Sequence, residues 1–467
     1  EIPLRLVGSE MCIRDRNKTV MNSHSFFTKP PPLKLFFLAS LPGAAGMLAS
    51  ALYQLLDGIF VGQFLGETPF AALNLAMPFV IINFALADLI GVGSSVPISI
   101  SLGKKEEQEA NNLFTCSCLM IVLSGIFVGV LLYAAAPALI GFMGAKGDFA
   151  RFATEYLRVY AICSPVTTIV FAADNYLRIC GRIRYSMFVN IFMSVISAVL
   201  ELIFLSVFRQ VWAAALATCT GMAFCVLLSF LPFFRGKMQL RFCRPHFSAR
   251  MVRQIISCGT PNFLSNIAGR ITSILMNLLL VRFGGEAAVS VYGILMYVDG
   301  FIQPLLYGMC DSLQPAVGYN WGAGRFSRVR ALEKCCFAAS LVISVVSAIV
   351  IFLFPSQITL LFMAGADAAF LTMCTGALQL FALTYATRWL SFAAQSYLLA
   401  VGKALPASII SLSIALLFPV LFVIAFWQLG LTGLWLNFAG SSLMAGLLAL
   451  FLLWKNRADL HRADSAS

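Results

Sequence analysis

Long apolar runs, separated by short polar or Gly/Pro-rich breaks, follow one another along most of the chain. About 20 predominantly apolar residues are enough to cross a bilayer as an α-helix, and each run reaches that length. The runs lie near residues 34–62, 69–101, 112–141, 150–177, 185–208, 211–234, 252–282, 287–320, 328–354, 368–399, 404–428 and 431–454. The pattern predicts an all-α polytopic membrane protein with twelve transmembrane helices.

The composition supports the same class. Hydrophobic residues make up 60% of the chain and charged residues 11%, and the mean hydropathy is +0.89. A soluble globule of ordinary composition is far less apolar. The net charge of +12 is carried mostly by short connections between the runs, so it does not describe a basic soluble domain. We therefore expect the lipid bilayer as a partner and no nucleic acid.

The basic residues also predict an orientation. The connections after even-numbered spans hold most of them, including Lys104, Lys105, Lys403 and the cluster at 235–250. The connections after odd-numbered spans hold few. Basic residues are enriched in cytoplasmic loops. We expect a multi-pass protein of the plasma (inner) membrane with both termini in the cytoplasm.

The chain repeats itself. At an offset of 219 residues Pro42 meets Pro261, and Ser101-Leu102-Gly103 meets Asn320-Trp321-Gly322. Each half contains an even number of spans, so both halves insert the same way up. This predicts two six-helix lobes related by a parallel pseudo-two-fold repeat, with the substrate cavity between them.

The connection RGKMQLRFCRPHFSAR divides the two halves, and residues 1–20 look unlike the rest of the chain. The predicted organisation is an N-terminal extension at 1–32, partly non-native or disordered, an N-lobe at 33–234 with spans 1–6, a cytoplasmic inter-lobe loop at 235–250, a C-lobe at 251–455 with spans 7–12, and a cytoplasmic tail at 456–467.

Three carboxylates lie inside the N-lobe spans. At 1.5 Å per residue, Asp57 lies about 8 Å and Glu201 about 12 Å below the outer surface, so they share a depth, whereas Asp88 is nearer the middle. No Lys or Arg lies at mid-membrane depth in this lobe to pair with them. The polar residues that would complete a site, or else hold helices together, are Gln54, Asn74, Asn190 and Ser197.

An unpaired carboxylate in a span is a candidate functional group. It can take up a proton or bind a cation, and either event couples the local structure to an ion gradient. We interpret Asp57, Glu201 and Asp88 as cation-coupling residues for H⁺ or Na⁺, with a possible Na⁺ site at Asp57 and Glu201. The alternative is a carboxylate that is hydrogen-bonded within the bundle and has no coupling role.

The C-lobe spans carry two cations and two anions. Arg270 and Asp299 lie at similar depth, and Arg388 and Asp311 lie deeper toward the cytoplasm. Buried charges are retained when they are paired, so the first interpretation of this balanced set is a structural ion-pair network. The alternative is that the four side chains line the substrate cavity.

Motifs for enzymatic chemistry are absent from the sequence. The thirteen cysteines are scattered through apolar runs, the three histidines fall in loops or tails, and there is no HExxH, GxSxG or nucleotide-binding loop. We expect neither an enzyme nor a cofactor.

Three motifs resemble the multidrug and toxic compound extrusion (MATE) family, in its bacterial branch. They are the spacing of Pro42, Asp57 and Gly62, the stretch from GVGSS to LGKK at the end of span 2, and QPAVGYNWGAG at 314–324. The resemblance implies two lobes in a V shape and efflux of cationic or amphipathic compounds against inward Na⁺ or H⁺. It also implies coupling acids on spans 1 and 5, which fall on Asp57 and Glu201.

The chain departs from the family at two places. Where the family commonly has an Asn one turn before an Asp on span 5, this chain has Ser197 and Glu201, a change that disfavours a Na⁺ site of the usual geometry. Arg270 on span 7 is unexpected, and a cationic group beside the cavity would exclude cationic drugs or favour anionic ones.

We therefore predict a secondary active multidrug exporter that moves organic, cationic or amphipathic compounds by alternating access and works as a monomer. The competing hypothesis is a flippase for a lipid-linked oligosaccharide or another amphiphile, in which Arg270 and Arg388 would hold pyrophosphate.

Overall fold

The computed structural model describes residues 23–363 and 367–462. Within these ranges, twelve helical segments are long and apolar enough to cross a membrane. This agrees with the sequence prediction span for span. The helices that provide them are α3 (Pro32–Leu65), α4 (Glu67–Gly103), α5 (Glu107–Phe142), α6 (Gly147–Thr167) with α7 (Ile169–Ile179), α8 (Ile183–Phe208), α9 (Val211–Phe234), α10 (Ala249–Gly322), α11 (Phe326–Leu353), α13 (Ala368–Ala400), α14 (Ala404–Leu412) with α15 (Phe418–Ala425), and α16 (Gly430–Arg462).

Helix α10 supplies two spans. Gly285 has φ 63° and ψ −157°, a conformation that a residue with a side chain rarely adopts, and it breaks the helix between them. We call Ala249–Gly285 the first limb and Ala287–Gly322 the second limb. The sequence predicted this break between residues 282 and 287.

Four short elements complete the structure: α2 (Ser23–Thr28), α12 (Pro355–Phe362), the π-helical turn η1 (Ser413–Leu417) and the 3₁₀ turn η2 (Trp427–Leu429). Helix α2 belongs to the predicted N-terminal extension and is packed against the C-lobe. Phe27 is fully buried with its ring 5.4 Å from that of Tyr319, and Arg328 donates to the Pro30 carbonyl at 2.7 Å. Residues 1–20, interpreted as non-native or disordered, lie outside the described residues.

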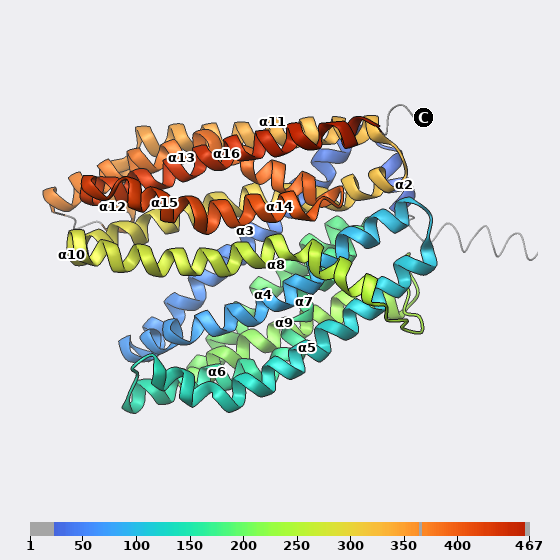
Figure 1. Cartoon of the computed structure of the whole chain (residues 1–467). Helices are drawn as coiled ribbons and strands as arrows, with labels where there is room; N and C mark the ends of the chain where they lie inside the picture. Colours follow the sequence, from blue (N-terminus) through green and yellow to red (C-terminus); the bar gives the residue numbers. More distant parts are fainter. Residues whose placement is uncertain (1–22, 364–366, 463–467) are drawn as a thin grey trace, which may run out of the picture.

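The helices form two groups, α3–α9 and α10–α16, which are the predicted lobes. The groups lie close together at the end that holds α2 and the C-terminus and further apart at the other end (Figure 1). Because the Lys/Arg-rich connections at 104–105, 182–184 and 235–250 lie at the first of these ends, we call it the basic end.

The hydrophobic cores follow this arrangement. One buried cluster, around Tyr156 and Tyr160, contains N-lobe residues alone, and another, around Phe381 and Tyr385, contains C-lobe residues alone. A third cluster combines both lobes and is built from residues toward the basic end, such as Leu102. The two lobes thus have separate cores toward one end and share a core at the basic end.

A pair of repeat-related glycines brings the lobes into backbone contact there. A Cβ on Gly103 would lie 2.2 Å from the carbonyl oxygen of Tyr319, and one on Gly322 would lie 2.1 Å from that of Ile100. Residues 100 and 103 plus the offset of 219 give 319 and 322, so the two contacts are symmetry mates. This supports a pseudo-two-fold axis between α4 and the second limb. We call the close contacts of α3 (43–44) and α4 (89–103) with α10 (255–259 and 308–323) the interlobe seam.

Candidate functional site

The two acids predicted on spans 1 and 5 face each other inside the N-lobe. Asp57 on α3 is 7% exposed and Glu201 on α8 is fully buried, and their carboxyl groups interact directly. Two carboxylates in contact repel each other unless a proton or a cation lies between them. A shared proton or a bound cation would remove this repulsion.

The surroundings of the pair are neutral. Tyr53 on α3 donates to Glu201 Oε2 at 3.4 Å, and its hydroxyl also shares a hydrogen bond of 2.7 Å with Thr218 Oγ1 on α9. Asp57 Oδ1 and Glu201 Oε1 are buried without a hydrogen-bond partner. Among the described residues neither acid forms an ion pair. Arg158 of α6 lies over the Tyr133 ring, with its guanidinium 5.0 Å from the ring centre.

The predicted supporting residues separate into three groups. Ser197 lies one turn before Glu201 with its hydroxyl buried against Gly221 and without a hydrogen-bond partner, so it remains close to the pair. Gln54 and Asn74 are exposed on α3 and α4. Asn190 agrees with the alternative prediction, that of holding helices together, because its amide donates to Asp174 Oδ1 at 2.7 Å.

Asp174 and Arg178 form an ion pair one helical turn apart on α7, at 2.5 Å. Residues of α8 bind both members of the pair. Ser186 donates to the Asp174 carboxylate and accepts from Arg178 Nε at 3.3 Å, and the Arg178 side chain is only 3% exposed. This network joins α7 to α8 and accounts for Asn190 in structural terms.

Asp88 does not join the Asp57–Glu201 pair. It lies half-buried on α4 beside the interlobe seam, and the charged group that acts on it is Asp311 of the second limb. Asp311 accepts a hydrogen bond from Gln314 at 2.9 Å, and Gln314 donates to Ser396 of α13 at 3.0 Å. The acids of spans 2 and 8 therefore belong to the region between the lobes.

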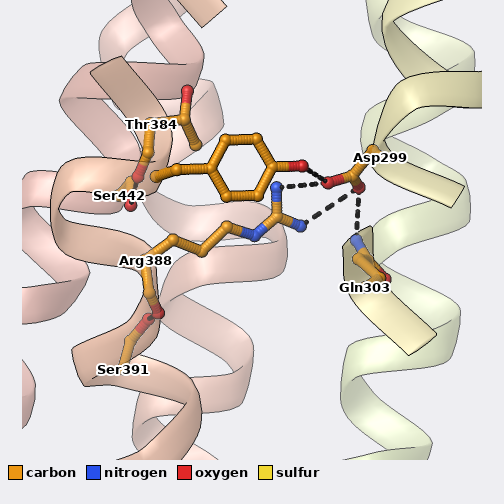
Figure 2. Close-up of polar contacts among 7 residues, drawn as sticks. Asp299, Gln303, Thr384, Arg388, Ser391 and Ser442 are labelled. Carbon is orange, nitrogen blue, oxygen red and sulfur yellow. Dashed lines mark hydrogen bonds and ion pairs between the residues drawn. The ribbon is translucent and has the colours of Figure 1, made fainter. Parts of the chain in front are cut away.

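Of the four C-lobe charges predicted to form an ion-pair network, two form an ion pair among the described residues. Arg388 on α13 binds Asp299 on the second limb through both oxygens, at 3.0 and 3.3 Å. Tyr385 donates to the same carboxylate at 2.5 Å, and Gln303 donates to it from one turn further along (Figure 2). The depth estimate had placed Arg388 beside Asp311.

Arg270 stands apart from this pair. Its side chain is exposed, and within the described part of the chain it makes no hydrogen bond or ion pair. The titratable side chain that interacts with it is that of Tyr292, which also lies near Asp299. Arg270 is therefore not a member of a balanced structural set.

Sequence reasoning missed the hydroxyl and amide groups that hold the charges. Tyr53, Thr218, Tyr385 and Gln303 all bind a buried carboxylate or its partner. Gln303 lies four residues after Asp299, on the same helix face as the acid it binds. Tyr53 lies four residues before Asp57, on the same face of α3, and binds the partner acid Glu201. That spacing is a signal available in the sequence.

The family model described as MatE matches residues 42–203 and 261–424, which cover corresponding parts of the two lobes. The multidrug export protein MepA of Staphylococcus saprophyticus is 26% identical over 449 residues, which span 94% of this chain and 98% of that protein. MepA of Staphylococcus aureus is also 26% identical, over 92% of this chain and 95% of its own length.

Solved structures show the same fold. One described as the outward-facing conformation of a multidrug resistance MATE family transporter of the MOP superfamily superposes with a TM-score of 0.88 at 23% identity, covering 96% of this chain and 99% of that one. A MOP superfamily transporter from Pyrococcus furiosus gives a TM-score of 0.87 at 22% identity, covering 94% and 98%.

Proposed function

Because this chain belongs to the MatE family of membrane transporters, we propose that it is a secondary active exporter that couples entry of H⁺ or Na⁺ to efflux of organic, cationic or amphipathic compounds. The observation that carries the proposal is the interaction of Asp57 with Glu201 in a buried part of the N-lobe, where neither acid pairs with a Lys or Arg of the described residues. Export of drugs by the MepA proteins, as their names state, is consistent with it.

The contact geometry suggests how an ion would act. When both carboxyl groups are ionised they repel each other, and a proton or Na⁺ removes the repulsion. The buried oxygens of Asp57, Glu201, Ser197 and Thr218 are the hard donors that either ion uses. Separate pH and Na⁺ gradients distinguish the two ions.

Helix α3 links the acid pair to the place where the lobes meet. Asp57 lies in its outer half, and Gly43 and Ala44 in its inner half touch Ser312 and Gly308 of the second limb. Pro42, directly before this contact, removes a backbone hydrogen bond and permits bending. Relief of repulsion at Asp57 would alter the position of α3 and with it the interlobe seam, which is the requirement for alternating access.

The remaining assignments follow from the same proposal. The protein would lie in the bacterial plasma membrane with the basic end and both termini in the cytoplasm, in line with the positive-inside rule. Its partners would be the lipid bilayer and small-molecule substrates, it would need no cofactor beyond the coupling ion, and it would work as a monomer.

The test uses purified protein in proteoliposomes that contain a fluorescent organic cation. An imposed pH gradient and an imposed Na⁺ gradient are applied separately. We expect one gradient to drive dye movement and Asp57→Asn to abolish it, because the neutral side chain removes the like-charge contact with Glu201. Asp148→Asn is the matched control, since Asp148 is 73% exposed and pairs with Arg151 at 3.1 Å. Unchanged transport by Asp57→Asn would remove Asp57 from the mechanism.

A further inference from the structure

Arg270 places a guanidinium group near the midpoint of a membrane span. It lies in the first limb, Ala249–Gly285, its side chain is exposed, and no described residue bonds to it. A charge at this depth is strongly disfavoured in contact with lipid, so such residues face a bundle interior or a water-filled cavity. An exposed charge at this depth is therefore expected to face water and not lipid.

The neighbouring residues indicate which face of the first limb is polar. A polar stripe on the first limb consists of Asn262, Asn266, Arg270, Ser273 and Asn277, at intervals of three and four residues that place them on one face of the helix. Ser273 accepts a hydrogen bond from Tyr292 of the second limb at 3.4 Å. Ile271, Ile274 and Leu278, on the adjoining face, are exposed and apolar, as residues in contact with lipid are.

The other charges of the C-lobe interior are already bound. Arg388 is held by Asp299 through two hydrogen bonds, and Asp311 accepts from Gln314. Of the two cations that the described spans of this lobe hold well inside the membrane, Arg388 is therefore paired and Arg270 is not. A planar guanidinium in this state is suited to a carboxylate, which it binds with two parallel charge-assisted hydrogen bonds.

We propose that Arg270 is a specificity-determining residue that binds the acidic group of amphipathic substrates in the space between the lobes. The preferred ligands are compounds with an extended apolar part and a carboxylate, including zwitterions whose positive group points away from Arg270. This proposal narrows the amphipathic substrates of the proposed function to those that carry an acidic group. Its biological role rests on the proposed export function, although binding itself needs no ion gradient.

Two xanthylium dyes provide the probe, because one carries a free carboxylate and the other is its methyl ester. Binding of each dye to detergent-purified protein is measured by fluorescence anisotropy. We expect the wild type to bind the carboxylate dye more tightly than the ester. Arg270→Met should weaken binding of the carboxylate dye by about tenfold or more and change ester binding by less than about twofold, and Arg270→Lys should keep part of the preference.

Arg282→Met is the control for loss of a positive charge from the same limb, since Arg282 lies near its outer end with its guanidinium 5.8 Å from the Trp427 ring centre. It should leave both affinities unchanged. Equal loss for the two dyes in Arg270→Met, or a wild type that prefers the ester, would overturn the proposal. If Arg270→Met does not fold, Arg270→Gln and the wild-type preference decide in the same way.

Gradient-driven efflux of both dyes from proteoliposomes separates this proposal from the export function. Efflux that fails while the dye preference and its dependence on Arg270 persist would refute export and retain the binding site. Efflux of both dyes with equal efficiency in the wild type and Arg270→Met would refute the role of Arg270 in specificity and retain export.

Discussion

Asp299→Asn is the substitution with the largest expected effect on stability. The carboxylate of Asp299 accepts two hydrogen bonds from Arg388, one from Tyr385 and one from Gln303. Asparagine keeps the shape but removes the charge and places an NH₂ group among these donors. Arg388, whose side chain is 15% exposed, would remain as a nearly buried and unpaired cation.

The magnitude follows from that arrangement. Removing one partner of a buried ion pair generally costs about 3–5 kcal/mol, because the remaining charge loses its compensation. Against a total stability of about 5–15 kcal/mol, this is a large fraction. The double variant Asp299→Asn with Arg388→Met removes both charges, so we expect it to be more stable than Asp299→Asn alone.

The assay is reversible unfolding in mixed micelles with increasing SDS, followed by tryptophan fluorescence, for the wild type, both single variants and the double variant. A double-mutant cycle then gives the coupling energy of the pair. The exposed pair Arg151–Asp148 provides the control, and Asp148→Asn should change the free energy of unfolding by less than about 1 kcal/mol. Strict additivity in the cycle, or a loss below about 1 kcal/mol for Asp299→Asn, would show that the ion pair does not stabilise the lobe.

Three further predictions test other contacts. Gly322→Ala, whose methyl group would lie 2.1 Å from the Ile100 carbonyl oxygen, should lower the free energy of unfolding by about 1–3 kcal/mol. Gly293→Ala on the same limb, with nothing within 4 Å, should not lower it. Equal effects of the two substitutions in SDS unfolding would contradict the close packing of the interlobe seam. Tyr53→Phe should change the ion concentration for half-maximal efflux by about 2–10-fold and leave folding intact, because one neutral hydrogen bond to Glu201 is lost. Asn190→Ala should cost about 1–3 kcal/mol of stability and leave the ion dependence of efflux unchanged; an altered ion dependence would return Asn190 to the cation site.

The spans were predictable because one physical requirement, an apolar helix as long as the bilayer is thick, fixes them. The break at Gly285 also followed from the sequence, since the apolar pattern is interrupted there. Helix α12 did not, because an eight-residue apolar stretch after a span looks like a continuation of the span or a loop. The π-helical turn η1 has no signal of its own apart from Pro419, two residues after it.

The candidate site was predictable where the depth of a residue in the membrane determines which residues of other helices it can reach. Counting residues from the outer end placed Asp57 and Glu201 at the same level, and in the structure they meet. Depth alone does not give the rotation of each helix about its axis. That rotation directs Arg388 to Asp299 and not to Asp311, and Asn190 to Asp174 and not to Asp57. Cross-helix partners of this kind depend on packing that one sequence does not determine.

The placement of uncompensated charge has a consequence for coupling. The buried Asp57–Glu201 pair attracts a proton or a small cation, whereas the exposed Arg270 repels cations and attracts anionic groups. The coupling ion and an acidic substrate would therefore occupy different lobes and would not compete for the same side chains. A conformational change of the protein then has to connect ion binding with substrate binding. The contact of Gly43 and Ala44 of α3 with the second limb is a direct link between the lobes, which makes α3 the element whose movement both ligands would have to bias.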